Sequence, residues 1–204
     1  GCGALLSNTT GANNTAVGNQ ALNKQTSPGS NTAVGCRAAG CTTTADYTTA
    51  IGNNALVVQT TGACNTAVGM QSGDSVTTGY QNALYGWKSG DSLNIGYCNT
   101  MLGVYAGHTN TSGYNNTYVG RAALGNASDT NNQVVIGSVV TGNGTQTAFI
   151  AGTSGAYNGA NNSSWSTTSD RRIKKNIVDN TIGLDKINQI QVRNFEYRTV
   201  DEIT

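Results

Sequence analysis

Glycine recurs along the first two thirds of the chain at a fixed interval of 17 residues. The series is Gly1, Gly18, Gly35, Gly52, Gly69, Gly86, Gly103, Gly120 and Gly137. A period kept over eight steps is the signature of a stack of repeats, in which each repeat buries its apolar face against its neighbours. The segment before each glycine, such as Asn31-Thr32-Ala33-Val34, alternates in the manner of a short strand. The sequence therefore predicts a mostly β fold, a parallel β-solenoid or β-roll of eight 17-residue coils over residues 1–137.

Each coil should have a defined inside and outside. The residue before the glycine is apolar in every coil, and we expect this column, represented by Val34, to fill the interior. Asn31 and its equivalents should form a ladder of side-chain amides along the stack. Ala33 and Gly35 then form an outer strip of small residues, through which we expect three copies to pack as a homotrimer. The alternative is that the small residues only allow tight coils in a monomer.

The rest of each coil should consist of a turn, a second strand of small residues and another turn. A second group of glycines lies seven residues before the next periodic glycine, and we expect positive φ angles there. This group comprises Gly11, Gly62, Gly79, Gly96 and Gly113.

Charge and composition narrow the possible functions. The formal net charge is +1, so no basic surface for nucleic acid or an anionic membrane is expected. No apolar run approaches the 18 or so residues that a membrane span needs, and no membrane insertion is expected. Residues 1–160 hold eight of the charged side chains and residues 170–204 hold the other thirteen, which indicates a boundary near residue 160. Because Gly1 is already in phase with the repeat, we expect a piece of a longer chain.

The five cysteines show no spacing typical of a metal site, and no metal or cofactor is expected. Cys2 and Cys36 share one repeat position two coils apart, about 9.6 Å, which is too far for a disulfide within one chain. Cys64 and Cys98 have the same relationship, and Cys41 is the fifth cysteine. We expect buried free thiols, with reactive or interchain cysteines as the alternative.

The sequence Ser-Gly-Asp-Ser occurs twice and places Asp74 and Asp91 at one repeat position on adjacent coils. Carboxylates about 5 Å apart are typical of a retaining glycosidase or a cation site, but two solvated loop aspartates explain the pattern more simply. Aromatic residues nearby favour a glycan contact patch over a catalytic site. The candidate patch is Trp87, Tyr80, Tyr85 and Tyr97.

Two other features have simple explanations. A column of threonines would suit an ice-binding face, but it is interrupted, and the β-propensity of threonine accounts for it. Its members are Thr15, Thr32, Thr49, Thr66, Thr100 and Thr117. His108 has no Ser or Cys partner at a recognisable spacing, and we interpret it as a surface loop residue.

Beyond Gly137 the period ends, and we expect three parts in the chain. Residues 1–137 form the repeat shaft or head, residues 138–169 an irregular β collar that closes the solenoid, and residues 170–204 a short α+β module. In that module the spacing of Leu184, Ile187 and Ile190 predicts a helix, and residues 192–198 alternate as a strand.

Two resemblances extend these expectations. Residues 14–22, Asn-Thr-Ala-Val-Gly-Xaa-Xaa-Ala-Leu, resemble the head repeats of trimeric autotransporter adhesins, a family of left-handed parallel β-rolls. The segment from Ser169 to Lys174 resembles the entry motif of the peptidase S74 family, the intramolecular chaperone of phage tail fibres and tailspikes. That resemblance implies trimerisation, assisted folding of the fibre upstream, and self-cleavage between Ser169 and Asp170 with Ser169 and Lys174 as the dyad. The family domain is longer than the segment before Thr204, so we expect a truncated or reduced module, or an intact bond.

Together these features predict a structural and receptor-binding trimeric fibre of a phage tail, located on the virion or outside the cell. The expected partners are two further copies of the chain, a host surface glycan or protein receptor, and other tail proteins. No enzyme acting on an external substrate is expected. The alternatives are the head of a bacterial trimeric adhesin and a fragment of a glycan depolymerase tailspike.

Overall fold

A computed structural model describes residues 1–27, 29–151, 155–159 and 166–167, and all structural statements below concern these residues. The chain divides into two compact units, Gly1–Thr168 and Ser169–Thr204, of which the first is described here. The described part contains short strands and no helix. The strands are β1 (Thr15–Val17), β2 (Thr32–Val34), β3 (Thr49–Ile51), β4 (Thr66–Val68), β5 (Ala83–Tyr85), β6 (Thr100–Leu102), β7 (Thr117–Val119), β8 (Ala123–Leu124), β9 (Val134–Ile136), β10 (Val140–Thr141), β11 (Thr147–Ala151), β12 (Gly155–Gly159) and β13 (Ser166–Thr167).

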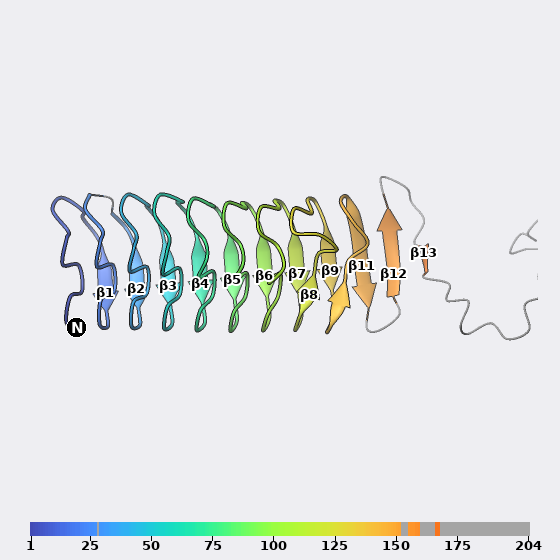
Figure 1. Cartoon of the computed structure of the whole chain (residues 1–204), viewed down its shortest axis with the longest axis horizontal. Helices are drawn as coiled ribbons and strands as arrows, with labels where there is room; N and C mark the ends of the chain where they lie inside the picture. The colour runs from blue at the N-terminus through green and yellow to red at the C-terminus, as the bar shows by residue number, and fades with distance from the viewer. Residues whose placement is uncertain (28, 152–154, 160–165, 168–204) are drawn as a thin grey trace, which may run out of the picture. The chain divides into compact units, whose positions relative to one another are not determined.

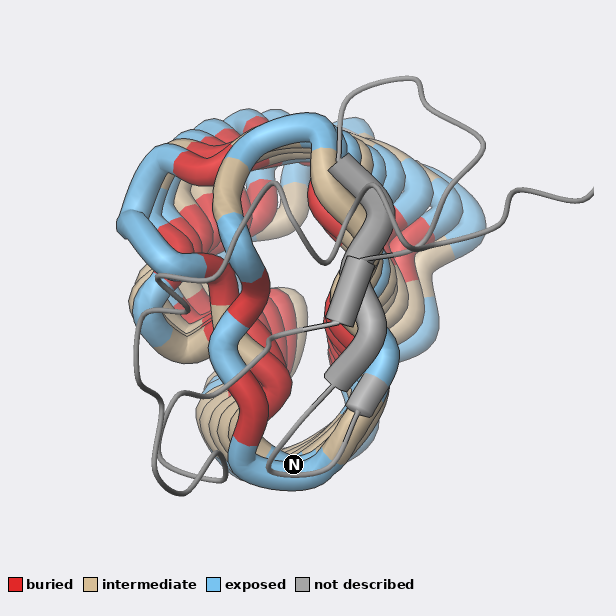
Figure 2. The backbone as a smooth tube through the Cα atoms, turned by 90° about the vertical axis from the view of Figure 1, so that its right-hand side faces the viewer, coloured by how far each residue is buried: buried red, intermediate tan, exposed pale blue. Residues whose placement is uncertain are grey.

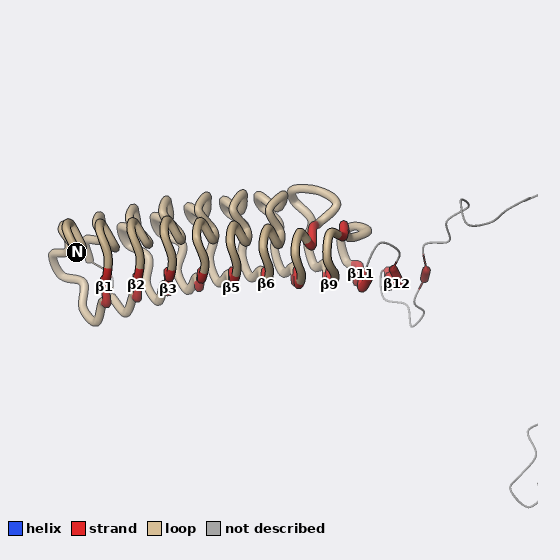
Figure 3. Tube along the Cα trace, turned by 90° about the horizontal axis from the view of Figure 1, so that it is seen from below, coloured by secondary structure: helices blue, strands red, loops and turns tan. Residues whose placement is uncertain are grey.

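The predicted parallel β-solenoid is confirmed. Strands β1 to β7 and then β9 pair in parallel, each with the equivalent strand of the next coil, and Figure 1 shows them stacked in chain order. The register advances by one repeat at every step, so that Ala33 pairs with Ala16 on one side and with Ala50 on the other. The strands lie along one side of the stack, and turns and loops form the rest of each coil (Figure 3).

Most coils contain one strand, and the predicted second strand is wrong for them. After the periodic glycine the chain enters turns in which residues at two positions have left-handed backbone conformations, as at Gln20 (φ 56°) and Leu22 (φ 49°). An extended strand cannot include such residues. The segment still bonds from coil to coil, since the Leu22 amide donates to the Ala38 carbonyl at 3.0 Å. Only β8 and β10 form a separate two-stranded sheet within the described residues.

The two faces of the strand are the reverse of those predicted. Ala33, Ala50 and Ala67 are completely buried, whereas Val34 and Ile51 are more than one third exposed. Figure 2, along the stack, shows the buried residues of successive coils superimposed in continuous columns. The alanine position therefore faces the interior, and the apolar position before the glycine faces outward.

The interior is filled by side chains of compensating size. In the first coils the strand contributes alanine, and leucines from the turn after the glycine, Leu22 and Leu56, occupy the core. In later coils the strand contributes Leu84, and the facing turn position is Gly73. A Cβ atom at Gly73 would lie 2.6 Å from Leu84 Cδ1. The same exchange occurs where Met101 and Tyr118 meet Gly107, so a larger strand residue faces a glycine in the turn.

The predicted asparagine ladder is confirmed and lies in the interior. The Nδ2 groups of Asn82, Asn99 and Asn116 each donate to the Oδ1 atom of the asparagine one coil earlier at 3.1 Å. The same Oδ1 atoms accept the backbone N–H of the next coil, as from Asn99 N to Asn82 Oδ1 at 3.0 Å. Thr48 replaces asparagine in one coil, and there Gln59 Nε2 donates to the Thr48 hydroxyl at 3.0 Å.

The periodic glycines are needed for two reasons. From Gly18 to Gly120 their φ angles lie between 125° and 138°, a region that L side chains rarely adopt. In addition, a Cβ atom at Gly69 would lie 2.4 Å from the Gly86 carbonyl oxygen of the next coil. None of the five turn glycines has a positive φ, so that prediction is wrong. Four of them are required by close approach instead: a Cβ atom at Gly79 would lie 2.4 Å from the Gly96 oxygen, and Gly62, Gly96 and Gly113 are equally tight.

Past the last full coil the stacking continues in modified form. Strand β11 pairs in parallel with β9, placing Ala148 opposite Val134, and β12 and β13 then add antiparallel neighbours. The predicted helix around Leu184 to Ile190 and the strand at 192–198 lie outside the described residues. In the described part no helix is long and apolar enough to cross a membrane.

Candidate functional site

The outward strand position forms a continuous apolar column along the sheet, here called the outer apolar column. Its members are Val17, Val34, Ile51, Val68, Tyr85, Leu102, Val119 and Ile136. Six of them are between 36 % and 56 % exposed, and Val68 and Val119 are half-buried. Contiguous exposed apolar surface of this kind marks sites of protein interaction.

Two neighbouring columns complete this outward face. The residue after the periodic glycine adds exposed apolar side chains at Met70, Trp87 and Val104. On the other side of the outer apolar column, the threonine column also faces outward, and Ala83 interrupts it. The sheet therefore presents a flat face on which the threonine column lies beside the outer apolar column, with further apolar side chains on the other side of that column.

Three tyrosines form a stacked ladder on consecutive coils, here called the tyrosine ladder. The ring centroids of Tyr80 and Tyr97 lie 4.9 Å apart with the rings 3° from parallel, and Tyr97 and Tyr114 repeat this geometry. Backbone bonds fix the spacing, since the Cys98 amide donates to the Tyr80 carbonyl at 3.1 Å. Partial burial and the neighbouring phenols Tyr114 and Tyr80 raise the pKa of Tyr97.

A second aromatic group lies at different positions of the repeat. The rings of Trp87 and Tyr105 are 4.9 Å apart at 60°, and His108 meets the Tyr105 ring edge-on at 5.5 Å. Lys88 places its Nζ atom 5.8 Å from the centre of the Tyr105 ring. His108 Nδ1 also lies 3.1 Å from the Tyr105 carbonyl, so this residue packs into the group and is only half exposed.

Asp74 and Asp91 occupy one repeat position on adjacent coils, with His108 next in the same column. Burial raises the pKa of Asp74, and the charge of Asp91 adds to this effect while Lys88 opposes it. Burial also raises the pKa of Asp91, although Lys88 and His108 act against it. The Lys88 Nζ atom lies 3.9 Å from Asp91 Oδ2. No group of three or more potential metal ligands occurs among the described residues.

The cysteines lie at the surface, and the expectation of buried thiols is wrong. Cys2, Cys36 and Cys64 are exposed, and Cys41 and Cys98 are half-buried. Cys64 and Cys98 have φ angles of 59° and 56°, at the bend where the chain turns toward the buried asparagine ladder. Their side chains therefore point outward from a corner of the coil. All five are free thiols.

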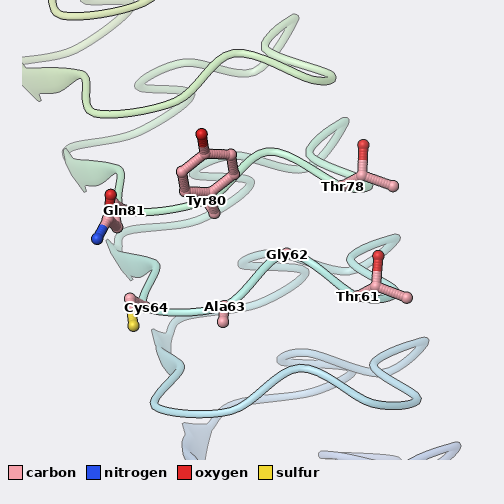
Figure 4. Close-up of a pocket in the computed structure, with 7 residues that line it drawn as sticks. All are labelled: Thr61, Gly62, Ala63, Cys64, Thr78, Tyr80 and Gln81. Atoms are coloured by element: carbon pink, nitrogen blue, oxygen red, sulfur yellow. The ribbon is translucent and has the colours of Figure 1, made fainter.

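A hollow of about 370 Å³ lies at the N-terminal end of the tyrosine ladder. Figure 4 shows Tyr80 standing above Ala63, with Gln81 and Cys64 toward the strands and Thr78 and Thr61 at the far end. The lining residues are Thr61, Gly62, Ala63, Cys64, Thr78, Tyr80 and Gln81. The hollow exists because Ala63 occupies the position that tyrosine holds in each of the next three coils.

The four residues predicted as a glycan contact patch are distributed over separate features. Tyr80 and Tyr97 lie together in the ladder, whereas Tyr85 belongs to the outer apolar column and Trp87 pairs with Tyr105. Tyr114 and Tyr105 were missed. The 17-residue spacing could have identified both, because Tyr114 lies one repeat after Tyr97 and Tyr105 lies one repeat after Lys88.

The predicted dyad, Ser169 and Lys174, lies outside the described residues, and its geometry stays a prediction. Residues 169–204 match the family model Peptidase_S74, described as chaperone of endosialidase. This match and the parallel β-solenoid fit a phage fibre or tailspike-like protein. The match covers 36 of the 204 residues and does not extend to the repeats. No curated protein and no solved structure matches the chain.

Proposed function

We propose that the chain is a structural and receptor-binding segment of a homotrimeric phage tail fibre, and that its C-terminal segment assists the folding of the trimer. The outer apolar column is the observation that carries the proposal. Eight apolar side chains in register on one face, six of them more than one third exposed, leave a surface that a second copy of the same face would cover.

The contact proposed between copies differs from the one expected from sequence. The strip of small residues is interior and cannot meet a neighbour, so the flat face formed by the outer apolar column and the threonine column takes its place. The number three comes from the S74 resemblance, because that domain is trimeric in its family. A flat face repeated at every coil allows three shafts to pack side by side along their whole length.

The architecture explains why a folding domain is useful. Strands β1 to β7 and β9 pair with residues 17 positions away, and no coil is stable before its neighbours form. Parallel pairing of this kind is slow, and three chains must begin in the same register. A domain that joins the three C-terminal ends would set that register before the coils stack.

Sedimentation of the 204-residue chain and of the variants Ile51→Lys and Leu102→Lys tests the trimer. We expect the unmodified chain to sediment as a trimer and the variants to shift toward monomer, because each would bury charges against apolar neighbours. Thr109→Lys, at an exposed turn position, is the matched control and should remain trimeric. A monomeric unmodified chain at micromolar concentration would contradict the proposal.

Receptor binding is the second part of the proposal, with a host surface glycan or protein as the partner. Tyr85 lies within the proposed contact between copies, so Tyr80 and Tyr97 are the better candidates for contact with a receptor. Adsorption of fluorescently labelled trimer to a panel of bacterial strains tests this role. Binding to none of the strains, under conditions in which the trimer is intact, would count against it.

Self-cleavage between Ser169 and Asp170 is part of the same proposal and rests on the resemblance. A lysine acts as a general base when its pKa is lowered, and Arg171 and Arg172 next to Lys174 would have that effect. Denaturing mass measurement of freshly made chain should show a fragment ending at Ser169. The same fragment should be missing from Ser169→Ala and Lys174→Ala. Equal masses in all three would mean that the motif is inert.

A glycan depolymerase is the second candidate, favoured by one observation. Asp74 and Asp91 lie at one repeat position on adjacent coils, and burial raises the pKa of both carboxyl groups, as the general acid of such a pair requires. Release of reducing sugar from capsular polysaccharide by the unmodified chain, and its loss in Asp91→Asn, would support this candidate. No release by the unmodified chain would exclude it for the polysaccharides used.

A further inference from the structure

We propose that the hollow beside Tyr80 is a subsite for one neutral saccharide ring, formed by a missing step in the tyrosine ladder. This inference rests on the proposed receptor-binding function and gives it a location and a class of ligand. One face of the Tyr80 ring is stacked on Tyr97 at 4.9 Å, and the ring borders the hollow toward the coil of Ala63. Tyr80 is 42 % exposed, so an aromatic platform is open to a ligand.

The dimensions of the gap come from the repeat itself. The backbone amide of Gln81 donates to the Ala63 carbonyl at 3.0 Å, and that of Cys64 donates to the Asp46 carbonyl at 2.9 Å. These bonds hold the coils in the same register as those of the ladder. A ring placed over Ala63 would therefore lie against Tyr80 as Tyr97 does on the opposite face. On the far side, Asp46 occupies the position equivalent to Ala63 on the preceding coil.

The groups around the gap indicate the chemistry of the ligand. None of the seven lining residues is charged, which favours a neutral ligand. Hydroxyl groups of Thr61 and Thr78 border the hollow and bond to no other group among the described residues. Cys98 Sγ donates to Gln81 Oε1 at 3.2 Å, which orients the Gln81 amide and leaves its Nε2 donors unbonded within the described part.

A saccharide ring combines the two features that this site offers to bind. One face of a pyranose carries C–H groups that pack on an aromatic ring, and its edge carries hydroxyl groups that need donors and acceptors. The lining supplies a ring face with hydroxyl and amide groups at its edge, in the pattern usual for ligand sites: an apolar surface with a few placed polar groups. A volume of about 370 Å³ is at the lower end of the usual range for ligand pockets, as a subsite for a single ring requires.

The test uses the trimer and a set of neutral methyl glycosides, namely the gluco, galacto, manno and N-acetylglucosamine forms, observed by saturation-transfer NMR. We expect at least one glycoside to bind through its C–H face. Tyr80→Ala, which removes the platform, should weaken binding about tenfold. Ala63→Tyr, which fills the gap with a fourth ladder tyrosine, should abolish binding. Ala63 has no positive φ, so its backbone accepts tyrosine. Tyr114→Ala, at the other end of the ladder, is the matched control and should bind as the unmodified trimer does.

Each result decides the matter. Unchanged binding in Ala63→Tyr, or binding of phenol and of no glycoside, would overturn the subsite while leaving receptor binding intact. Binding of no glycoside by a trimer that adsorbs to bacteria would likewise reject only the subsite. Failure to adsorb to any strain, together with no glycoside binding, would reject both proposals. Melting curves of Tyr80→Ala and Ala63→Tyr show whether a loss of binding reflects loss of fold. The first variant enlarges the gap and the second fills it.

Discussion

Substitution of a periodic glycine in the middle of the stack should unfold the solenoid locally. In Gly69→Ala the new Cβ atom would lie 2.4 Å from the Gly86 carbonyl oxygen, whereas ordinary contacts begin near 3.4 Å. The two coils must therefore separate by about 1 Å at this point. Because the contact is with backbone and not with the end of a flexible side chain, no rotamer change relieves it.

The cost can be estimated from the bonds at that junction. The Gly86 amide donates to the Val68 carbonyl at 2.8 Å, and the Lys88 amide donates to the Met70 carbonyl at 3.0 Å. A separation of 1 Å stretches such bonds beyond the usual limit, with a loss of about 1 kcal/mol each. The φ angle of +138° adds about 1–3 kcal/mol for any residue with a side chain. The total is about 3–5 kcal/mol, a large part of the stability of a typical domain.

Denaturant unfolding at fixed protein concentration measures this loss, and limited proteolysis shows whether opening begins near residue 69. Gly40→Ala is the matched control, because Gly40 has no positive φ and the equivalent residues of other coils, such as Val57 and Asp74, carry side chains. We expect the control to change the free energy of unfolding by less than about 1 kcal/mol. Equal effects of the two substitutions would refute the argument from close approach.

Three other substitutions follow from the interior and from the shifted pKa values. Burial raises the pKa of Tyr118 to about 12 from 10. The free energy of unfolding should therefore be constant below pH 10 and fall by about 2–3 kcal/mol between pH 10 and 12. Melting experiments across that range should show no such fall for Tyr118→Phe. Because the pKa of Asp74 is raised, ionisation of this carboxyl group opposes folding once the pH exceeds its usual pKa. Asp74→Asn should therefore raise the melting temperature at pH 7 and have no such effect near pH 3. The gain in the free energy of unfolding should be under about 1 kcal/mol, because the group is partly solvated. Asn99→Ala removes the partner of Gly113 O and of the Asn116 amide groups, and should cost at least about 3 kcal/mol in denaturant unfolding, whereas exposed Asn53→Ala should cost almost nothing.

The period, the parallel register and the amide ladder could be predicted from sequence because each depends only on equivalent residues lying above one another. Spacing in the sequence decides this without any knowledge of the coil's shape. The second strand could not be predicted, because alternating small residues such as Ala21 and Leu22 suit a strand as well as a pair of left-handed turns. Which conformation is adopted depends on bonds to the next coil, as from Leu22 N to Ala38 O.

The inside and outside of the strand were decidable from the ladder. Side chains alternate along a strand, so Asn31 and Ala33 share one face and Thr32 and Val34 the other. A ladder of amides is useful only where water is excluded, and it therefore assigns the interior to the alanine position. The apolar residues at the Val34 position favour the opposite assignment, because in an isolated coil an exposed apolar column has no explanation. It acquires one if copies of the chain pack together.

Individual sites on a regular stack arise where one coil departs from its neighbours. In the first coils the core is filled from the turn by Leu22 and Leu56, and from β5 onward it is filled from the strand, which leaves glycine in the turn at Gly73. The tyrosine ladder starts at this same change of pattern, with Tyr80 on the coil of β5 and Ala63 on the coil before it. Since register is held by backbone bonds in every coil, side chains at the surface are free to change without disturbing the stack. Binding features can thus be added one coil at a time to a shaft whose stability depends on its interior.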